Sequence, residues 1–327
     1  MAAEPESGPL SSISHSAPLL LAGPTAVGKS EIAALLAERL GGEIISVDSM
    51  QVYRGMDIGT AKPSPGERAR VPHHLIDVLD LPESFDAAQF LQLAHRAVSD
   101  IQARGRVPIL CGGTGLYFKV FLDGLGQTPP VDAALRALLR ATPLPELLRE
   151  LAERDPAAYE RIDRQNPRRV IRAIEVIRLT GQPFSSQRSN WQPSPLVPRS
   201  SSLQFGLART PADLHRRIEA RVDAMFRRGW VAETEALLKR GLAQNQTAMQ
   251  ALGYRHIVEH LRGERSLADT IALIKIRTRQ FAKRQMTWFR RQLRLTWVHL
   301  EPQSSAEEIV KTIAAHWTFS LRDGIDR

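Results

Sequence analysis

The chain has 327 residues, of which 43% are hydrophobic, so it can bury a large core and its length favours two structural units. Its net charge of +9 at pH 7 points to an acidic partner, and its single cysteine, Cys111, excludes an intrachain disulfide and a cysteine-built zinc site. No run approaches the roughly 18 apolar residues of a membrane-spanning helix, so we expect no membrane partner and a cytoplasmic protein.

The first predicted element is an apolar strand at residues 19–22, which runs into Gly-x-x-x-x-Gly-Lys-Ser and then into a helix after Lys29. This order is that of a phosphate-binding P-loop, in which glycines let successive backbone N–H groups converge on an anion at a helix N-terminus. Lys29 would contact a phosphate, and the Ser30 hydroxyl would complete the shell of a Mg²⁺ ion held by that phosphate. The motif predicts a diphosphate or triphosphate without saying which, bound by Gly23, Pro24, Thr25, Ala26, Val27, Gly28, Lys29 and Ser30.

Strands and helices then alternate, with a strand at 43–47, a helix at about 87–103 and a strand at 107–111. This order is typical of an α/β fold in which helices cover both faces of a parallel sheet. Polar or glycine-rich turns follow the two strands, Asp48-Ser49-Met50-Gln51 after the first and Gly112-Gly113-Thr114-Gly115 after the second. Because ligands bind such sheets at the carboxyl ends of the strands, we expect the site to lie there.

Several side chains in this region have both a functional and a structural interpretation. Asp48 suits a magnesium ligand, a general base or a helix N-cap, and its place with Thr114 at neighbouring strand ends favours a role in the site. His73 and His74 lie in a predicted loop without an acid or cysteine at ligand spacing, so a structural role is favoured. Cys111 follows an apolar run, so we expect a buried small side chain rather than a nucleophile.

The pattern becomes helical from residue 128, with helix starts near Asp132 and Pro167 and an end at Gly181. Residues 161–190 carry seven Arg against two acidic residues, and a Pro/Ser-rich linker follows at 191–202. The N-terminal residues lack the basic start and apolar stretch of a signal peptide. We therefore predict three parts: a flexible N-terminal extension at 1–17, a P-loop core formed by 18–127 and 203–327, and a helical insertion domain with its linker at 128–202.

The last third is predicted to contain a strand at 203–207, helices at about 211–228, 231–239 and 268–293, and a strand at 295–299. On the long helix, Ile274, Phe281 and Trp288 recur on one face, which predicts packing, while Lys and Arg gather on another. Residues 275–294 contain eight Lys or Arg and no Asp or Glu, so this helix and 161–190 together carry +13 and the rest of the chain −4. A positive field localised in this way favours a polyanionic partner over a solvated helix face.

Six segments, in order along the chain, closely resemble the bacterial tRNA dimethylallyltransferases. They are GPTAVGKS at 23–30, IISVDSMQVYRGMDIGTAKP at 44–63, PHHLID at 72–77, GGTGLY at 112–117, GYR at 253–255 and TRQFAKRQMTWFR at 278–290. The resemblance implies transfer of a dimethylallyl group from dimethylallyl diphosphate to the exocyclic amine of the adenosine 3′ to the anticodon, in tRNAs that read codons beginning with U. It also implies the anticodon stem-loop as partner, an inserted helical subdomain that binds it, and Mg²⁺ as cofactor.

The resemblance assigns roles to individual residues. Asp48 matches the family's proposed general base, Thr114 matches a position that contacts the substrate near the reacting centre, and Lys29 would stabilise the leaving diphosphate. The tRNA-binding positions that it implies are Asp48, Ser49, Met50, Gln51, Thr114, Arg136, Arg168, Arg169, Val170, Ile171, Arg172, Gln250, Ala251, Leu252, Gly253, Tyr254, Arg255, Lys283, Arg284, Gln285, Met286, Thr287, Trp288, Phe289 and Arg290.

Two other functions fit part of the pattern. An isopentenyltransferase that acts on free adenine nucleotides would share the phosphate cradle and Asp48, but a free nucleotide does not need so long a basic surface. A P-loop protein that binds RNA and hydrolyses or senses nucleotide would share the cradle and the basic stretches, and RNA-stimulated ATP turnover without prenyl transfer would identify it. An asymmetric tRNA partner is compatible with a monomer.

Overall fold

The computed structural model describes residues 17–125, 129–187 and 203–323. The chain divides into two compact units, one formed by Met1–Phe121 with Pro195–Arg327 and the other by Leu122–Ser194. The predicted N-terminal extension, apart from Ala17, and the predicted linker at 191–202 lie outside the described residues. The larger unit contains the P-loop and the sheet, whereas the described part of the smaller unit is helical.

The larger unit is built on a six-stranded sheet in which each neighbouring pair of strands is parallel. Strands β1 and β2 are buried along their whole length, as a sheet covered on both faces requires. The predicted α/β fold with a parallel sheet flanked by helices is confirmed. In spatial order the strands are β3 (His73–His74), β2 (Gly42–Val47), β4 (Val107–Gly112), β1 (Leu19–Ala22), β5 (Gln204–Ala208) and β6 (Thr296–His299).

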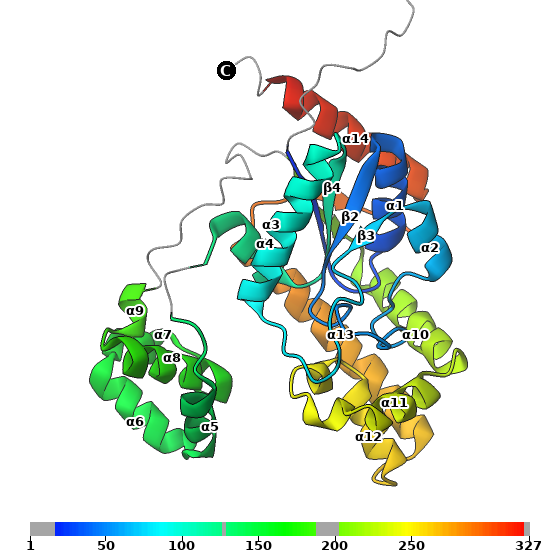
Figure 1. The fold of residues 1–327 in the computed structure, drawn as a ribbon. Helices are drawn as coiled ribbons and strands as arrows, with labels where there is room; N and C mark the ends of the chain where they lie inside the picture. The colour runs from blue at the N-terminus through cyan, green and yellow to red at the C-terminus, as the bar shows by residue number, and fades with distance from the viewer. Residues whose placement is uncertain (1–16, 126–128, 188–202, 324–327) are drawn as a thin grey trace, which may run out of the picture. The chain divides into compact units, whose positions relative to one another are not determined.

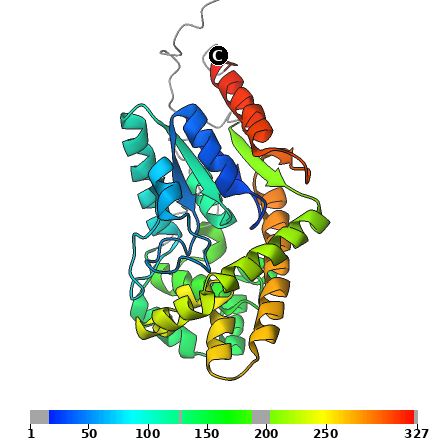
Figure 2. The ribbon, with the colours of Figure 1, turned by 90° about the vertical axis from the view of Figure 1, so that its right-hand side faces the viewer.

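Helices lie on both sides of this sheet (Figures 1 and 2). On one side α1 (Lys29–Leu40) packs against α14 (Ala306–Asp323), and α3 (Ala87–Ala103) covers β2 and β4 from the other. The limits of α3 agree with the predicted helix because Asp86 caps it, accepting hydrogen bonds from the backbone N–H groups of Ala88 and Gln89.

The other helices of the larger unit gather mainly toward the carboxyl ends of the strands (Figure 1). The long helix α13 packs against both α10 and α12. The helices with their bounds are α2 (Pro65–Arg70), α4 (Gly115–Asp123), α10 (Pro211–Arg227), α11 (Trp230–Lys239), α12 (Tyr254–Leu261) and α13 (Leu267–Gln292).

Three features of the larger unit differ from the sequence-based expectations. His73 and His74 form the short edge strand β3 rather than a loop, because they pair with Ile44 and Ile45. On α13, Phe281 is 37% exposed, so its predicted packing is wrong; the buried apolar positions are Ile274, Ala282 and Phe289. At about 100° per residue, Ala282 and Phe289 lie about 80° and 60° around the helix from Ile274, whereas Phe281 lies about 20° to the other side, so the packed face at this end of the helix is turned away from Phe281. The helices α2, α4 and α12 were not predicted.

The smaller unit contains α5 (Ala133–Ala141), α6 (Leu144–Arg154), α7 (Pro156–Arg161), α8 (Pro167–Thr180) and α9 (Phe184–Gln187). Its core contains Leu139, Leu147 and Leu151 packed with the apolar face of α8. The predicted helix signals are confirmed: Asp132 caps α5, Pro167 is the first residue of α8, and Gly181 ends α8 with φ 69°.

Candidate active site

Three loops leave the sheet at the same level. Val47 at the end of β2 pairs with Gly112 of β4, and Gly112 pairs with Ala22 of β1. The P-loop, Asp48 and the Gly113–Thr114 turn therefore begin side by side at the carboxyl edge, and the backbone N–H of Thr114 donates to the Val47 carbonyl at 3.2 Å. The prediction that Asp48 and Thr114 follow neighbouring strands is confirmed.

The P-loop adopts a conformation that depends on glycine at one position. Gly28 has φ 111°, which side chains rarely tolerate, and it begins α1 without a side-chain cap, so the first N–H groups of the helix are left for an anion. The Lys29 ammonium donates to the Pro24 carbonyl at 2.8 Å, across the loop. Burial lowers the pKa of Lys29 to about 8. A phosphate arriving at this loop would therefore meet a poorly solvated ammonium group.

A cavity of about 640 Å³ opens in front of the P-loop. Its wall combines Gly28, Lys29 and Ser30 with two guanidinium groups of α10, those of Arg217 and Arg221. Arg70 and the carboxylates of Glu31 and Glu67 also line the cavity, so its cationic side chains outnumber its acidic ones by four to two. The net positive charge of this wall favours a diphosphate.

Two arginines that the sequence analysis missed hold the P-loop itself. Arg209, directly after β5, donates from Nε to the Val27 carbonyl at 2.9 Å, and Arg217 donates from Nε to the Ala26 carbonyl at 3.0 Å. Asp213 pairs with Arg209 at 2.9 Å. The place of Arg209 at a strand end was a usable signal in the sequence, whereas nothing local distinguishes Arg217 from the other arginines of α10.

Asp48 is held by one oxygen and leaves the other available. Its Oδ1 accepts hydrogen bonds from the N–H groups of Met50 at 2.8 Å and Gln51 at 3.2 Å, in a turn rather than at the start of a helix. Among the described residues, Oδ2 has no hydrogen-bond partner. The Asp48 charge acts on both Lys29 and Arg221, which ties it electrostatically to the cavity wall. This carboxylate is anchored through one oxygen and has the other available to accept a hydrogen bond, which is an arrangement that a general base requires.

Thr114 and Gln285 connect the second loop to the P-loop. The Thr114 carbonyl accepts from Tyr117 and Phe118 at the start of α4, while the Thr114 hydroxyl has no partner within the described part of the chain. Gln285 accepts from the Thr25 N–H and donates to the Gly113 carbonyl, both at 2.9 Å. One side chain of α13 therefore fixes the spacing of the two loops.

The predicted tRNA-binding positions divide by burial. A side-chain contact with RNA does not fit the six residues that are at most 9% exposed, because neighbouring side chains cover them: Val170, Ile171, Ala251, Tyr254, Gln285 and Phe289. The exposed positions in the same segments are Arg168, Arg169, Gln250, Arg255, Lys283, Arg284, Thr287 and Arg290. On α13, a groove of about 520 Å³ is lined by Lys283, Arg284, Thr287, Trp288 and Arg291 among others.

Arg136 and Arg172 are engaged within the helical unit. Both donate to Oε2 of the fully buried Glu175, at 2.6 and 2.7 Å, and Arg172 also donates to the Pro129 carbonyl. Burial alone would raise the pKa of Glu175, but the hydrogen bonds and charges of the two arginines outweigh it and hold the pKa below its usual value. The tRNA contacts predicted for Arg136 and Arg172 therefore compete with a structural ion pair.

The remaining titratable candidates have structural roles. His74 contacts the buried Glu43 carboxylate at 2.6 Å, and His73 contacts the Val71 carbonyl at 2.7 Å. Cys111 is partly exposed rather than buried as predicted, yet desolvation raises the pKa of its thiol to about 11. A thiol with so high a pKa is not a nucleophile at neutral pH.

The described residues contain no group of three or more His, Cys, Asp or Glu side chains that could hold a metal ion. The exposed Ser30 hydroxyl at the cavity wall suits a Mg²⁺ ion whose other ligands come from phosphate oxygens and water, the usual mode for this ion. In the part of the chain that the structure covers, no helix has the length and apolar character needed to cross a membrane.

Comparison with known proteins places this chain in a family. The family model described as IPP transferase matches residues 51–292. The chain is similar to the tRNA dimethylallyltransferase of Geobacter metallireducens, with 46% identity over 90% of this chain and 96% of the relative, and to that of Symbiobacterium thermophilum, with 45% identity over 94% and 98%.

Solved structures agree. The tRNA isopentenylpyrophosphate transferase of Bacillus halodurans superposes with a TM-score of 0.67 at 38% identity, covering 94% of this chain and 98% of that one. A eukaryotic dimethylallyltransferase, described as acting on tRNA, gives a TM-score of 0.77 at 27% identity over 91% of this chain and 77% of that one. With a P-loop, an anchored carboxylate and a matching sequence over most of its length, this chain belongs to the IPP transferase family.

Proposed function

We propose that this protein transfers a dimethylallyl group from dimethylallyl diphosphate to the exocyclic amine of the adenosine 3′ to the anticodon, in tRNAs that read codons beginning with U. The names of its relatives support tRNA as the acceptor and dimethylallyl as the transferred group. One observation carries the proposal: the P-loop, Asp48 and Thr114 follow the paired ends of the adjacent strands β1, β2 and β4. This pairing brings a phosphate cradle and an available carboxylate to one edge of the sheet.

In this proposal residues Gly23 to Ser30 bind the diphosphate. The Lys29 ammonium would turn from the Pro24 carbonyl to a phosphate oxygen, and the charges of Arg217 and Arg221 would stabilise the anion as it leaves. A Mg²⁺ ion, held by Ser30 and phosphate oxygens, would supply further charge neutralisation on the leaving group.

The reaction forms one bond and breaks one. The adenine amine nitrogen attacks C1 of the dimethylallyl group, the C1–O bond breaks, and the diphosphate leaves with the electron pair. The amine nitrogen then carries a positive charge until a proton leaves it. Asp48 is placed to accept that proton at Oδ2, since Oδ1 is already held by two N–H groups. Beside the Asp48 carboxylate, the Thr114 hydroxyl, which has no partner among the described residues, is a further polar group that would contact the substrates at this edge.

The target base must leave the anticodon loop to reach the sheet edge, and single-stranded loops are where bases unstack most readily. The exposed basic residues of α13 and α8 would contact the phosphate backbone, Lys283 and Arg284 on the first and Arg168 and Arg169 on the second. We propose a monomer that acts in the cytoplasm, where its tRNA substrates are.

Transfer of radiolabel from dimethylallyl diphosphate to unmodified tRNA with an A-A-A stretch tests the proposal. We expect label in tRNA with the wild type, and a loss of about 10² or more in kcat with Asp48→Asn, the amount a general base contributes. Asp100→Asn, on the exposed face of α3, is the matched control and should keep full activity. Label in free AMP but not in tRNA would instead identify a nucleotide prenyltransferase, and RNA-stimulated ATP turnover without transfer would identify an RNA-binding nucleotidase.

A further inference from the structure

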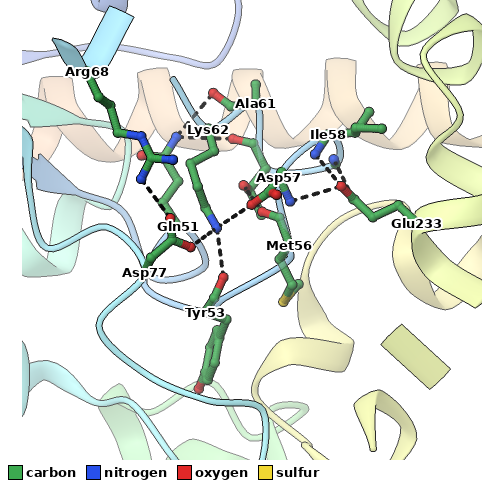
Figure 3. Close-up of polar contacts among 12 residues, drawn as sticks. Gln51, Tyr53, Met56, Asp57, Ile58, Ala61, Lys62, Arg68, Asp77 and Glu233 are labelled. Atoms are coloured by element: carbon green, nitrogen blue, oxygen red, sulfur yellow. Dashed lines mark hydrogen bonds and ion pairs between the residues drawn. The ribbon is translucent and has the colours of Figure 1, made fainter. Parts of the chain in front are cut away.

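The loop between β2 and α2, residues 48–64, carries Asp48 and Gln51 at its start and a tight turn at 57–61 near its end. The two parts are joined through the Gln51 amide, which donates to the carbonyls of Thr60 at 3.2 Å and Ala61 at 3.4 Å (Figure 3). The Gln51 side chain also accepts from the Ser46 hydroxyl at 2.8 Å, and the Gln51 N–H contacts the Asp48 carboxylate. The 57–61 turn is therefore one of the contacts that set the positions of Asp48 and Gln51.

The turn is held from a distant helix. The Glu233 carboxylate, on α11, accepts three successive backbone N–H groups: Oε2 accepts from Asp57 at 3.0 Å and Ile58 at 2.6 Å, and Oε1 accepts from Gly59 at 3.2 Å. Figure 3 shows Glu233 reaching this turn from the side opposite Lys62. Successive N–H groups of this kind form an anion-binding nest, and here the anion is supplied by the protein itself.

Glu233 is oriented by a second helix. The Tyr254 hydroxyl of α12 donates to Glu233 Oε1 at 2.7 Å, and Tyr254 is fully buried. The turn also packs closely against α11 itself, since a Cβ atom added to Gly59 would lie 2.2 Å from Nε1 of Trp230 in that helix. The contact between the turn and α11 therefore leaves no room for the turn to shift toward that helix.

A separate network holds the other side of the turn. The Lys62 ammonium, whose side chain is 1% exposed, contacts the Tyr53 carbonyl, Asp57 at 2.7 Å and Asp77 at 2.6 Å, and Arg68 contacts Asp77 at 2.7 Å. These groups are all within residues 53–77, so they shape the loop locally. Glu233 instead ties the loop to helices that begin more than 150 residues later in the chain.

We infer that Glu233, oriented by the Tyr254 hydroxyl, is a positioning residue that sets the place of Asp48 and Gln51 by binding the backbone N–H groups of residues 57–59. The inference rests on the proposed function, in which Asp48 accepts the amine proton. It also gives Tyr254 a role inside the protein, in place of the predicted contact with tRNA.

The test compares Glu233→Gln and Tyr254→Phe with Glu235→Gln in prenyl transfer and in hydrogen–deuterium exchange. A glutamine keeps the length of the side chain but replaces one acceptor oxygen with a donor NH₂, which faces backbone N–H groups. Tyr254→Phe removes one hydroxyl without leaving a cavity. Glu235 lies on the same helix, is 56% exposed and, among the residues that the structure describes, pairs only with Lys239, so it is the matched control.

We expect Glu233→Gln to lower kcat by about tenfold or more, with KM for dimethylallyl diphosphate within about threefold of the wild type, because the altered bonds act on the acceptor side of the site. Tyr254→Phe should lower kcat about threefold. The amides of residues 57–59 should exchange at least about tenfold faster in Glu233→Gln and at the wild-type rate in Glu235→Gln.

Two results would overturn the inference: wild-type kcat in Glu233→Gln, or unchanged exchange at residues 57–59. If Glu233→Gln does not fold, the same criteria apply to Tyr254→Phe, in which kcat equal to that of the wild type overturns it. Failure of the proposed function is distinguishable, because then the wild type itself transfers no label to tRNA.

Discussion

Replacing Gln285 with methionine should loosen the diphosphate side of the site rather than the RNA-binding surface. Gln285 is 8% exposed and bridges the Thr25 N–H and the Gly113 carbonyl. Methionine has nearly the same length and leaves no large cavity, but both backbone groups lose their partner. A buried polar group without a partner costs about 1–3 kcal/mol, so the two together should lower the free energy of unfolding by about 2–6 kcal/mol.

The assay has three measurements on the full-length protein. Denaturant unfolding should show the loss of stability, and titration should show a higher Kd for dimethylallyl diphosphate, because Thr25 belongs to the P-loop. The Kd for tRNA without the diphosphate should change less than about twofold, since Gln285 is covered. Gln92→Met, at an exposed position of α3, is the control and should leave all three unchanged. A large loss of tRNA affinity, with stability and diphosphate binding intact, would refute this reasoning and restore Gln285 as an RNA contact.

Three further predictions concern charge. The pKa of Lys29 is lowered to about 8, so the free protein loses this positive charge as the pH rises through 8. The Kd for dimethylallyl diphosphate should therefore increase between pH 7 and 9 in the wild type. An equally steep pH dependence of this Kd in Lys29→Met would contradict the prediction. The pKa of Glu175 is held below its usual 4.5, so the contribution of this carboxylate to stability is complete above that pH and is lost as the pH falls. Glu175→Gln should lower the free energy of unfolding by about 3 kcal/mol at neutral pH and should speed amide exchange in α8. Unchanged exchange would rule the ion pair out as a stabilising contact. The logarithm of the binding constant for tRNA should fall with the logarithm of the salt concentration, with a slope of about −0.7 to −0.9 per phosphate contacted. The binding constant for the diphosphate should depend much less on salt. Equal salt dependence of the two would show that the basic surfaces do not bind the tRNA.

The elements that the sequence predicted well carry their signals locally. The helix α8 begins at Pro167 after the Asn166 cap and ends at Gly181, and these signals lie within one turn of the boundaries they set. The P-loop is similar, because its two glycines, its lysine and its serine all lie within residues 23–30. The short strand β3 was missed because two histidines have no alternation to reveal them, and only pairing with β2 makes them a strand.

Burial and partner choice were less predictable. The family resemblance placed Arg136 and Arg172 among the RNA-binding positions, and the sequence does not show that the buried Glu175 engages both of them. In the same way, Tyr254 and Gln285 lie in segments that resemble tRNA-binding ones, although in the folded chain their polar groups face other parts of the protein.

The sequence by itself therefore determined the α/β order of elements, the phosphate cradle and the two loops carrying Asp48 and Thr114, since each rests on a pattern of a few neighbouring residues. Only the tertiary structure decided which side chains hold those loops. Arg209, Arg217 and Gln285 lie 182, 191 and 260 residues from the P-loop atoms that they bind. No local pattern specifies such partners, because they meet only when the sheet has formed and its carboxyl edge brings distant segments within hydrogen-bonding distance.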